Sequence, residues 1–180
     1  MVIATNLGFP RMGAKRELKK ALESYWQGNS SESELLETGQ ALRRQHWLLQ
    51  KESGIRHIPS NDFSLYDHVL DTVAMVGAVP KRFAWQGNEV DINTYFAMAR
   101  GVTPGAKTDV TAGTGIAAME MTKWFDTNYH YIVPEFEEGM LFRFSSTKAI
   151  DEFLEAKSLG IFTRPVLLGP VSFLLLGKSR

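Results

Sequence analysis

Short apolar segments alternate along this chain with longer amphipathic ones, and this alternation is the feature that most restricts its fold. The strongest predicted strand is the largely apolar run 163–168, typical of a parallel strand covered on both faces. Shorter strands are predicted at 3–7, 55–59, 129–133 and 141–144. Because strands that alternate with helices form parallel sheets, the pattern favours an α/β fold.

The amphipathic segments predict helices wherever apolar residues recur three or four positions apart. These helices span 15–27, 31–53, 65–76, 92–100 and 146–158. The second begins with a capping box, in which Ser31 is the N-cap and Glu34 is the third helical residue. Since the first two helices follow each other directly after one strand, we expect a helical hairpin.

The segment 101–118 is rich in Gly, Thr and Ala and has no apolar period, so we predict a mobile loop there. Its Gly113-Thr114-Gly115 is similar to part of a phosphate-binding loop. The Gly-Lys-Ser/Thr ending and the strand–helix context of that motif are missing, which argues against this interpretation.

Charge and composition exclude several classes of function. The chain has 20 Lys+Arg and 20 Asp+Glu, which argues against a general nucleic-acid-binding or anionic-membrane-binding protein. It has no Cys, and therefore no disulfide, no Cys-ligated zinc and no catalytic thiol. The longest uncharged apolar run, 165–177, is shorter than the ~20 residues of a membrane-spanning helix. The N-terminus lacks the pattern of a secretory signal, so we expect a cytoplasmic protein.

A basic cluster at the start of the first predicted helix is one candidate binding site. Only Glu17 offsets its cations, which are Arg11, Lys15, Arg16, Lys19 and Lys20. The free N–H groups of a helix N-terminus and nearby cations both favour an anion. The alternative is a solvated helix face, with Lys19 and Glu23 as an i, i+4 ion pair.

The segment 121–131 is a second candidate, because it combines Lys123 and His130 with several aromatic residues. Lys123 could bind an anion, and His130 could donate a proton. The alternative is that the aromatic side chains belong to the core and that His130 is a strand histidine with a satisfied hydrogen bond. The four His residues of the chain show no spacing typical of a zinc site.

The motifs of this chain resemble, in order, those of the N-terminal part of cobalamin-independent methionine synthases. They are LGFPRMG at 7–13, RELKKA at 16–21, YW at 25–26, DF at 62–63, YDHVL at 66–70, MTKWF at 121–125, TNYHY at 127–131 and PVLLGP at 165–170. The resemblance spans nearly the whole chain. It implies a partial (βα)₈ TIM-type barrel, roughly the first half of an N-terminal barrel, with the helical hairpin after its first strand.

The resemblance also implies a function. Enzymes of this family transfer a methyl group from 5-methyltetrahydropteroyl-polyglutamate to homocysteine. Their zinc, homocysteine site and catalytic residues lie in a C-terminal barrel that this chain lacks, and they use no cobalamin. Carried over by position, the site for the folate glutamate tail falls on Arg16, Glu17, Leu18, Lys19 and Lys123. Leu18 lies on the apolar stripe, so we expect it to support the segment, and Glu17 could orient a neighbouring cation.

Under this interpretation no catalytic residue and no metal ligand lies within residues 1–180. An alternative is a stand-alone, non-catalytic module that binds folate or another anionic metabolite. A third hypothesis, an interaction or nucleic-acid-binding domain that uses the basic helix, is disfavoured by the zero net charge.

The isolated fragment is predicted to self-associate. A partial barrel has two free sheet edges, and the apolar segment 171–176 would lack the cover of later helices. Light scattering at micromolar concentration should therefore detect species larger than a monomer. A stable, well-folded monomer would contradict this prediction.

Overall fold

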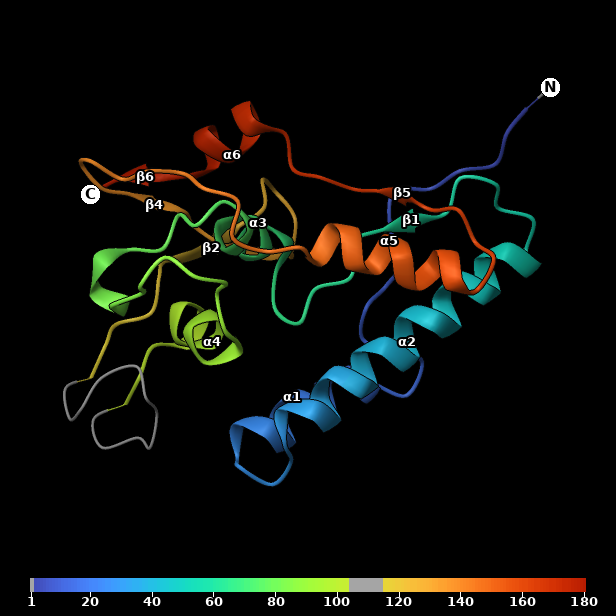
Figure 1. Ribbon diagram of the computed structural model, residues 1–180, viewed down its shortest axis with the longest axis horizontal. Coiled ribbons are helices and arrows are strands. Elements are labelled where there is room, and N and C mark those ends of the chain that lie inside the picture. The colour runs from blue at the N-terminus through green and yellow to red at the C-terminus, as the bar shows by residue number, and fades with distance from the viewer. Residues whose placement is uncertain (1, 104–114) are drawn as a thin grey trace. The chain divides into compact units, whose positions relative to one another are not determined.

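The computed structural model describes residues 2–103 and 115–180, and its chain forms two compact units (Figure 1). The first unit comprises Met1–Leu65 and Lys148–Val166, and the second comprises Tyr66–Thr147 and Leu167–Arg180. Most of the loop predicted at 101–118 lies outside the described residues. At its two ends, Val102 and Ile116 form an antiparallel bridge.

The helices of the first unit agree with the sequence predictions. They are α1 (Glu17–Trp26), α2 (Glu32–Glu52) and α5 (Lys148–Ser158). The capping box is confirmed, because the Ser31 side chain accepts from the Glu34 N–H and the Glu34 carboxylate accepts from the Ser31 N–H. The helical hairpin is present, since α1 packs along α2.

The strands of the first unit are parallel but short. β1 (Pro59–Ser60) pairs with β5 (Arg164–Pro165), and Thr5 forms a parallel bridge with His57. The core beside them contains Trp47, which is 2% exposed and donates its indole N–H to the Pro59 carbonyl at 3.0 Å. Trp47 thereby ties α2 to β1.

Four strand predictions differ from the structure. The strand predicted over 3–7 is reduced to the bridge at Thr5, and the one over 55–59 to the bridge at His57 and the first residue of β1. The strand predicted over 163–168 is reduced to Arg164 and Pro165, and both side chains are exposed rather than covered on both faces. The charged guanidinium favours water, and a proline cannot donate to a ladder, so this stretch suits an exposed position. The segment 141–144 forms no strand, and the Arg143 N–H instead donates to the Val76 carbonyl at 2.9 Å.

In its described residues, the second unit contains three α-helices and a short 3₁₀ turn, together with two separate strand pairs. The helical elements are α3 (His68–Met75), η1 (Lys81–Phe83), α4 (Ile92–Arg100) and α6 (Pro170–Leu176). The strands are β2 (Met121–Lys123) antiparallel to β3 (His130–Ile132), and β4 (Glu135–Phe136) parallel to β6 (Lys178–Ser179). Its most buried apolar side chains include Leu70, Val73, Met98, Ile132 and Val133.

The chain is thus a mixed α/β protein with small sheets, as the alternation of strands and helices predicted. Within the described residues, no helix combines the length and the apolar character needed to cross a membrane.

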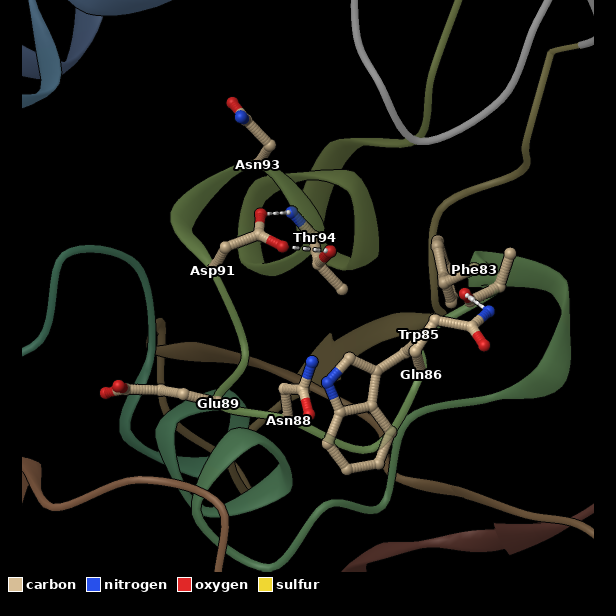
Figure 2. Close-up of a pocket in the computed structure, with 9 residues that line it drawn as sticks. Phe83, Trp85, Gln86, Asn88, Glu89, Asp91, Asn93 and Thr94 are labelled. Carbon is tan, nitrogen blue, oxygen red and sulfur yellow. Dashed lines mark hydrogen bonds between the residues drawn. The ribbon is translucent and has the colours of Figure 1, made fainter.

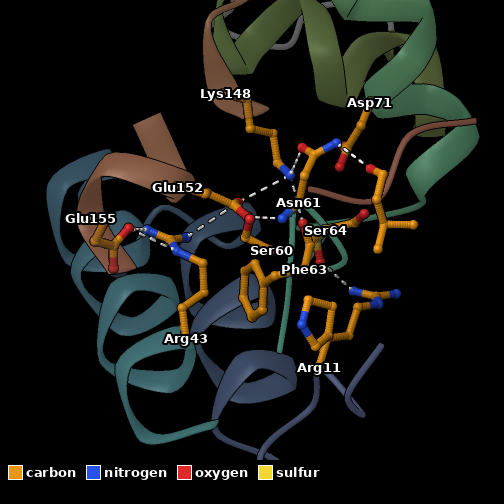
Figure 3. Close-up of polar contacts among 12 residues, drawn as sticks. Arg11, Arg43, Ser60, Asn61, Phe63, Ser64, Asp71, Lys148, Glu152 and Glu155 are labelled. Carbon is orange, nitrogen blue, oxygen red and sulfur yellow. Dashed lines mark hydrogen bonds and ion pairs between the residues drawn. The ribbon is translucent and has the colours of Figure 1, made fainter. Parts of the chain in front are cut away.

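A buried charge network holds α5 against α2 and the end of β1 in the first unit (Figure 3). Both Nε and Nη2 of Arg43 donate to Glu155 Oε2, at 3.0 and 2.7 Å. Glu152 pairs with Lys148 at 3.0 Å and accepts from the Asn61 N–H at 2.8 Å. Since Glu152 is 4% exposed, removing its carboxylate would leave the Asn61 N–H without its acceptor. Lys148 would lose its anionic partner but would still donate to Asn61 Oδ1 and to the Phe63 carbonyl.

We predict that Glu152→Ala lowers the free energy of unfolding by about 1–3 kcal/mol, the usual cost of leaving a buried hydrogen-bond donor without its acceptor. Glu152→Gln should cost less, because its amide oxygen can still accept from the Asn61 N–H. The control is Glu23→Gln, which breaks an exposed pair with Lys19 and should cost at most about 1 kcal/mol. Denaturant unfolding of the three variants measures this order, and an equal cost for all three would contradict it.

Glu152 also makes the stability of the folded protein depend on pH, and the direction of its pKa shift gives the sign. Burial raises the pKa of Glu152 above its ordinary value of 4.5, against the opposing effects of Lys148 and Arg43. The folded protein therefore binds this proton more tightly than the unfolded chain does, and the resulting stability is lost as pH rises through the raised pKa. The stability of the wild type relative to Glu152→Gln should fall as pH rises above 4.5, and a rise would contradict the direction of the shift.

Candidate functional site

The loop that leads into α1 is held by side-chain contacts within the first unit. The Phe9 N–H donates to Asp62 Oδ2 at 2.8 Å. Arg11 Nη1 donates to the carbonyls of Ser64 and Leu65, at 3.1 and 2.9 Å (Figure 3). Arg11, one of the cations in the predicted basic cluster, therefore anchors the loop.

Glu17 orders the backbone at the start of α1. Its Oε2 accepts from the Lys15 N–H at 2.9 Å. Hydrogen bonds from its own N–H and from that of Lys15 lower the pKa of the Glu17 carboxyl. Gly13 has φ 78°, and a Cβ there would overlap this carboxylate, so the turn requires glycine. Glu17 thus acts on the backbone of the basic segment.

The three other predicted residues of this segment differ in their environment. Arg16 is exposed and adopts the left-handed conformation, with φ 60° and ψ 38°, immediately before the first turn of α1. Leu18 is 0% exposed, in agreement with the supporting position predicted for it. Lys19 pairs with Glu23 at 3.4 Å, which confirms the predicted i, i+4 pair. Within residues 2–103 and 115–180, the Arg16 guanidinium has no hydrogen-bond or ion-pair partner.

The second candidate segment forms an antiparallel hairpin in the second unit. Lys123 is exposed at the end of β2, directly opposite His130 in β3. The connecting turn closes through a 2.7 Å bond from the Trp124 N–H to the Tyr129 carbonyl. Phe125 adopts the left-handed conformation within this turn, with φ 50°. The hairpin therefore presents a cation and an imidazole side by side.

The aromatic residues of this hairpin are arranged around His68, at the start of α3. The His68 ring lies 5.4 Å from the Trp124 ring and stacks on Tyr129 at 5.9 Å. Phe125 is 74% exposed and Tyr129 is 39% exposed, so the alternative that these side chains belong to the core is wrong for both. It holds for Tyr131, which is 7% exposed.

Asp67 is the residue of this region that the sequence analysis missed. It is 1% exposed, and its Oδ2 accepts from the N–H groups of Leu70 and Ile132, at 2.9 and 3.0 Å. Its Oδ1 accepts from the Tyr129 hydroxyl at 3.0 Å. Burial raises the pKa of Asp67, and these hydrogen bonds act against the rise. An Asp directly before an apolar helix is an N-cap signal that could have identified its first contact.

The predicted folate-tail residues thus fall into two groups. Arg16, Glu17, Leu18 and Lys19 lie together at the start of α1 in the first unit, whereas Lys123 belongs to the second unit. Among the described residues, no three His, Asp or Glu side chains are placed to hold a metal ion. As the sequence also has no Cys, the side chains of residues 2–103 and 115–180 do not fit the zinc that the family resemblance implies.

A cavity of ≈ 520 Å³ lies in the second unit between η1 and the start of α4 (Figure 2). Trp85, Asn88, Glu89 and Asp91 contribute to its wall. The Asp91 carboxylate already caps α4, accepting from the N–H and the hydroxyl of Thr94 at 2.8 and 3.0 Å. With two carboxylates and no Lys or Arg in its lining, this cavity is unsuited to an anionic ligand.

Comparison with known proteins agrees with the resemblance in the sequence. The family model described as "Cobalamin-independent synthase, N-terminal domain" matches residues 3–180. Relatives named 5-methyltetrahydropteroyltriglutamate–homocysteine methyltransferase include one from Salinibacter ruber, 61% identical over the whole chain, and one from Parvibaculum lavamentivorans, 62% identical over 99% of it. One from Caulobacter vibrioides is 55% identical over the whole chain.

The chain spans 23% of the length of the Salinibacter protein, 22% of the Parvibaculum protein and 24% of the Caulobacter protein. The family match covers nearly every residue described above, including both candidate segments. The chain therefore belongs to the cobalamin-independent synthase family and corresponds to its N-terminal domain.

Proposed function

We propose that this chain helps a homocysteine methyltransferase to hold the glutamate tail of its 5-methyltetrahydrofolate substrate. The observation that carries the proposal is Arg16, an exposed cation without a side-chain partner in the described residues, at the N-terminus of a helix. A triglutamate tail, which appears in the names of the relatives, is a short row of carboxylates. Arginine and lysine bind carboxylates through charge-assisted hydrogen bonds.

The backbone at both candidate segments supports this proposal. Left-handed φ values are uncommon for residues other than glycine, and such strain tends to collect at ligand-binding sites. Arg16 has this conformation, and so does Phe125, two residues after Lys123. Both cations are thus held on restrained backbone, which reduces the entropy lost when a flexible polyanion binds.

The parallel pairing in the first unit supports the proposed partial (βα)₈ barrel. Thr5 bridges His57 and β1 pairs with β5, so segments from three regions of the chain join side by side in the same direction. A helical hairpin separates the first pair, which is the connectivity of one strand–helix repeat of a barrel. The connection from β1 to β5 is much longer, because it contains the elements from α3 to β4 before α5.

The chemistry itself is assigned to parts of the parent enzyme beyond this chain. Zinc lowers the pKa of a bound thiol, so that homocysteine reacts as a thiolate at neutral pH. Because the residues here do not fit zinc, this chain contributes binding and scaffold and no step of the methyl transfer. Its proposed location remains the cytoplasm.

Residues 1–180 alone are expected to form no methionine when homocysteine, the methyl donor and zinc are supplied. The reason is that the sequence has no Cys and its described residues hold no cluster of metal-binding side chains. The full-length enzyme, assayed under the same conditions, is the positive control. Methionine formed by the pure fragment would overturn the assignment.

In the full-length enzyme, Arg16→Ala and Lys123→Ala should each weaken binding of the triglutamate substrate by about 5–30-fold. This range corresponds to about 1–2 kcal/mol for a charged hydrogen bond whose strength is reduced by exposure to solvent. The monoglutamate substrate should change much less, because it lacks the outer carboxylates. Lys157→Ala is the matched control, as it removes an exposed cation from the last turn of α5. Steady-state KM values with both substrates test the proposal, and equal losses for the two would place these residues away from the tail.

A further inference from the structure

The hairpin that carries Lys123 needs an anchor. Its paired strands have three residues each, and the residues from Phe125 to His130 are exposed. A two-stranded hairpin is marginally stable in water, so its position depends on contacts with the rest of the unit. Whatever supplies these contacts sets where the Lys123 ammonium lies.

Asp67 supplies polar contacts to two parts of this hairpin. Its Oδ2 binds the Ile132 N–H in β3, and its Oδ1 binds the hydroxyl of Tyr129, the residue immediately before β3. The same Oδ2 also caps α3 by accepting from the Leu70 N–H. One buried carboxylate thus joins the helix, the strand and the turn that faces Lys123.

Charge makes these contacts stronger than neutral hydrogen bonds, and burial makes them costly to lose. The Asp67 side chain is 2% exposed, so water cannot readily replace a missing partner. Apolar burial of Ile132 and Val133 also holds β3. Those side chains lie beyond the turn in the sequence, and the turn itself is held by Asp67 together with the ring contacts of His68.

We propose that Asp67 is a positioning residue for anion binding by Lys123. Its carboxylate fixes the hairpin of residues 121–132 against the start of α3 and so places the Lys123 ammonium. The inference rests on the proposed function, since it concerns the same glutamate-tail site. Asp67 itself touches no ligand, and its effect passes through Lys123.

The test uses the full-length enzyme with triglutamate and monoglutamate substrates. Asp67→Asn replaces an acceptor oxygen with a donor and should raise the KM for triglutamate by about 3–10-fold, with little change in kcat or in the monoglutamate KM. Tyr129→Phe removes the hydroxyl that contacts Asp67 Oδ1 and His68 Nδ1, leaves the two backbone bonds of Asp67 in place, and should raise the same KM by about 2–3-fold. Asp91→Asn is the matched control, because Asp91 caps α4 in the same way but contacts no hairpin. It should leave both KM values unchanged.

A double-mutant cycle distinguishes a positioning effect of Asp67 on Lys123 from a general effect of Asp67 on the structure. If Asp67 acts through Lys123, Asp67→Asn should add nothing to the triglutamate KM once Lys123→Ala is present. Independent, additive effects would overturn the inference, as would equal losses for the two substrates. Should Asp67→Asn fail to fold, the same cycle with Tyr129→Phe decides. A Lys123→Ala variant with no preference between the substrates would instead overturn the proposed function, and this inference with it.

Discussion

Both units depend on one kind of interaction, a hydrogen bond in which a backbone N–H donates to a buried carboxylate. Glu152 receives the Asn61 N–H in the first unit, and Asp67 receives the Leu70 and Ile132 N–H groups in the second. Each carboxylate joins segments far apart in sequence. The described strands are only two or three residues long, so the hydrogen bonds between strands contribute little to holding each unit together. The hydrogen bonds to these carboxylates therefore fix the positions of the segments that they join.

Helices could be predicted from the sequence because their determinants are local. The capping box at Ser31 and the apolar spacing of 92–100 each lie within a few residues of the helix they define. Most strands could be located without their exact ends, and the one predicted at 141–144 does not form, because pairing depends on distant partners. The run 163–168 looks covered by composition, yet Arg164 and Pro165 are exposed where they pair with β1. The sequence shows how apolar a segment is, but it does not show which other segments pack against it.

The features of the candidate site also fall into those that local sequence predicts and those that depend on distant residues. The basic segment at 11–20 and the burial of Leu18 follow from charge and helical spacing, whereas the use of Arg11 as a loop anchor requires carbonyls 53 and 54 residues away. Asp67 was missed for the same reason, since its contact with Ile132 spans 65 residues. Its cap on α3 was readable from the sequence, but its contact with the hairpin was not.

Carboxylates close to a cationic site can form ion pairs with its cations, but Glu17 and Asp67 use their oxygens mainly for other hydrogen bonds. Glu17 is adjacent to Arg16 in sequence, but its oxygen is occupied by the Lys15 N–H. Asp67 lies beneath the hairpin of Lys123, and backbone N–H groups and a tyrosine hydroxyl occupy its oxygens. Backbone dipoles thus satisfy the anions that shape each segment. Glu17 still attracts Lys15 and Lys20 through its charge, but in the described residues neither Glu17 nor Asp67 forms an ion pair with Arg16 or Lys123. These two cations therefore keep their donors for the anionic ligand that we propose.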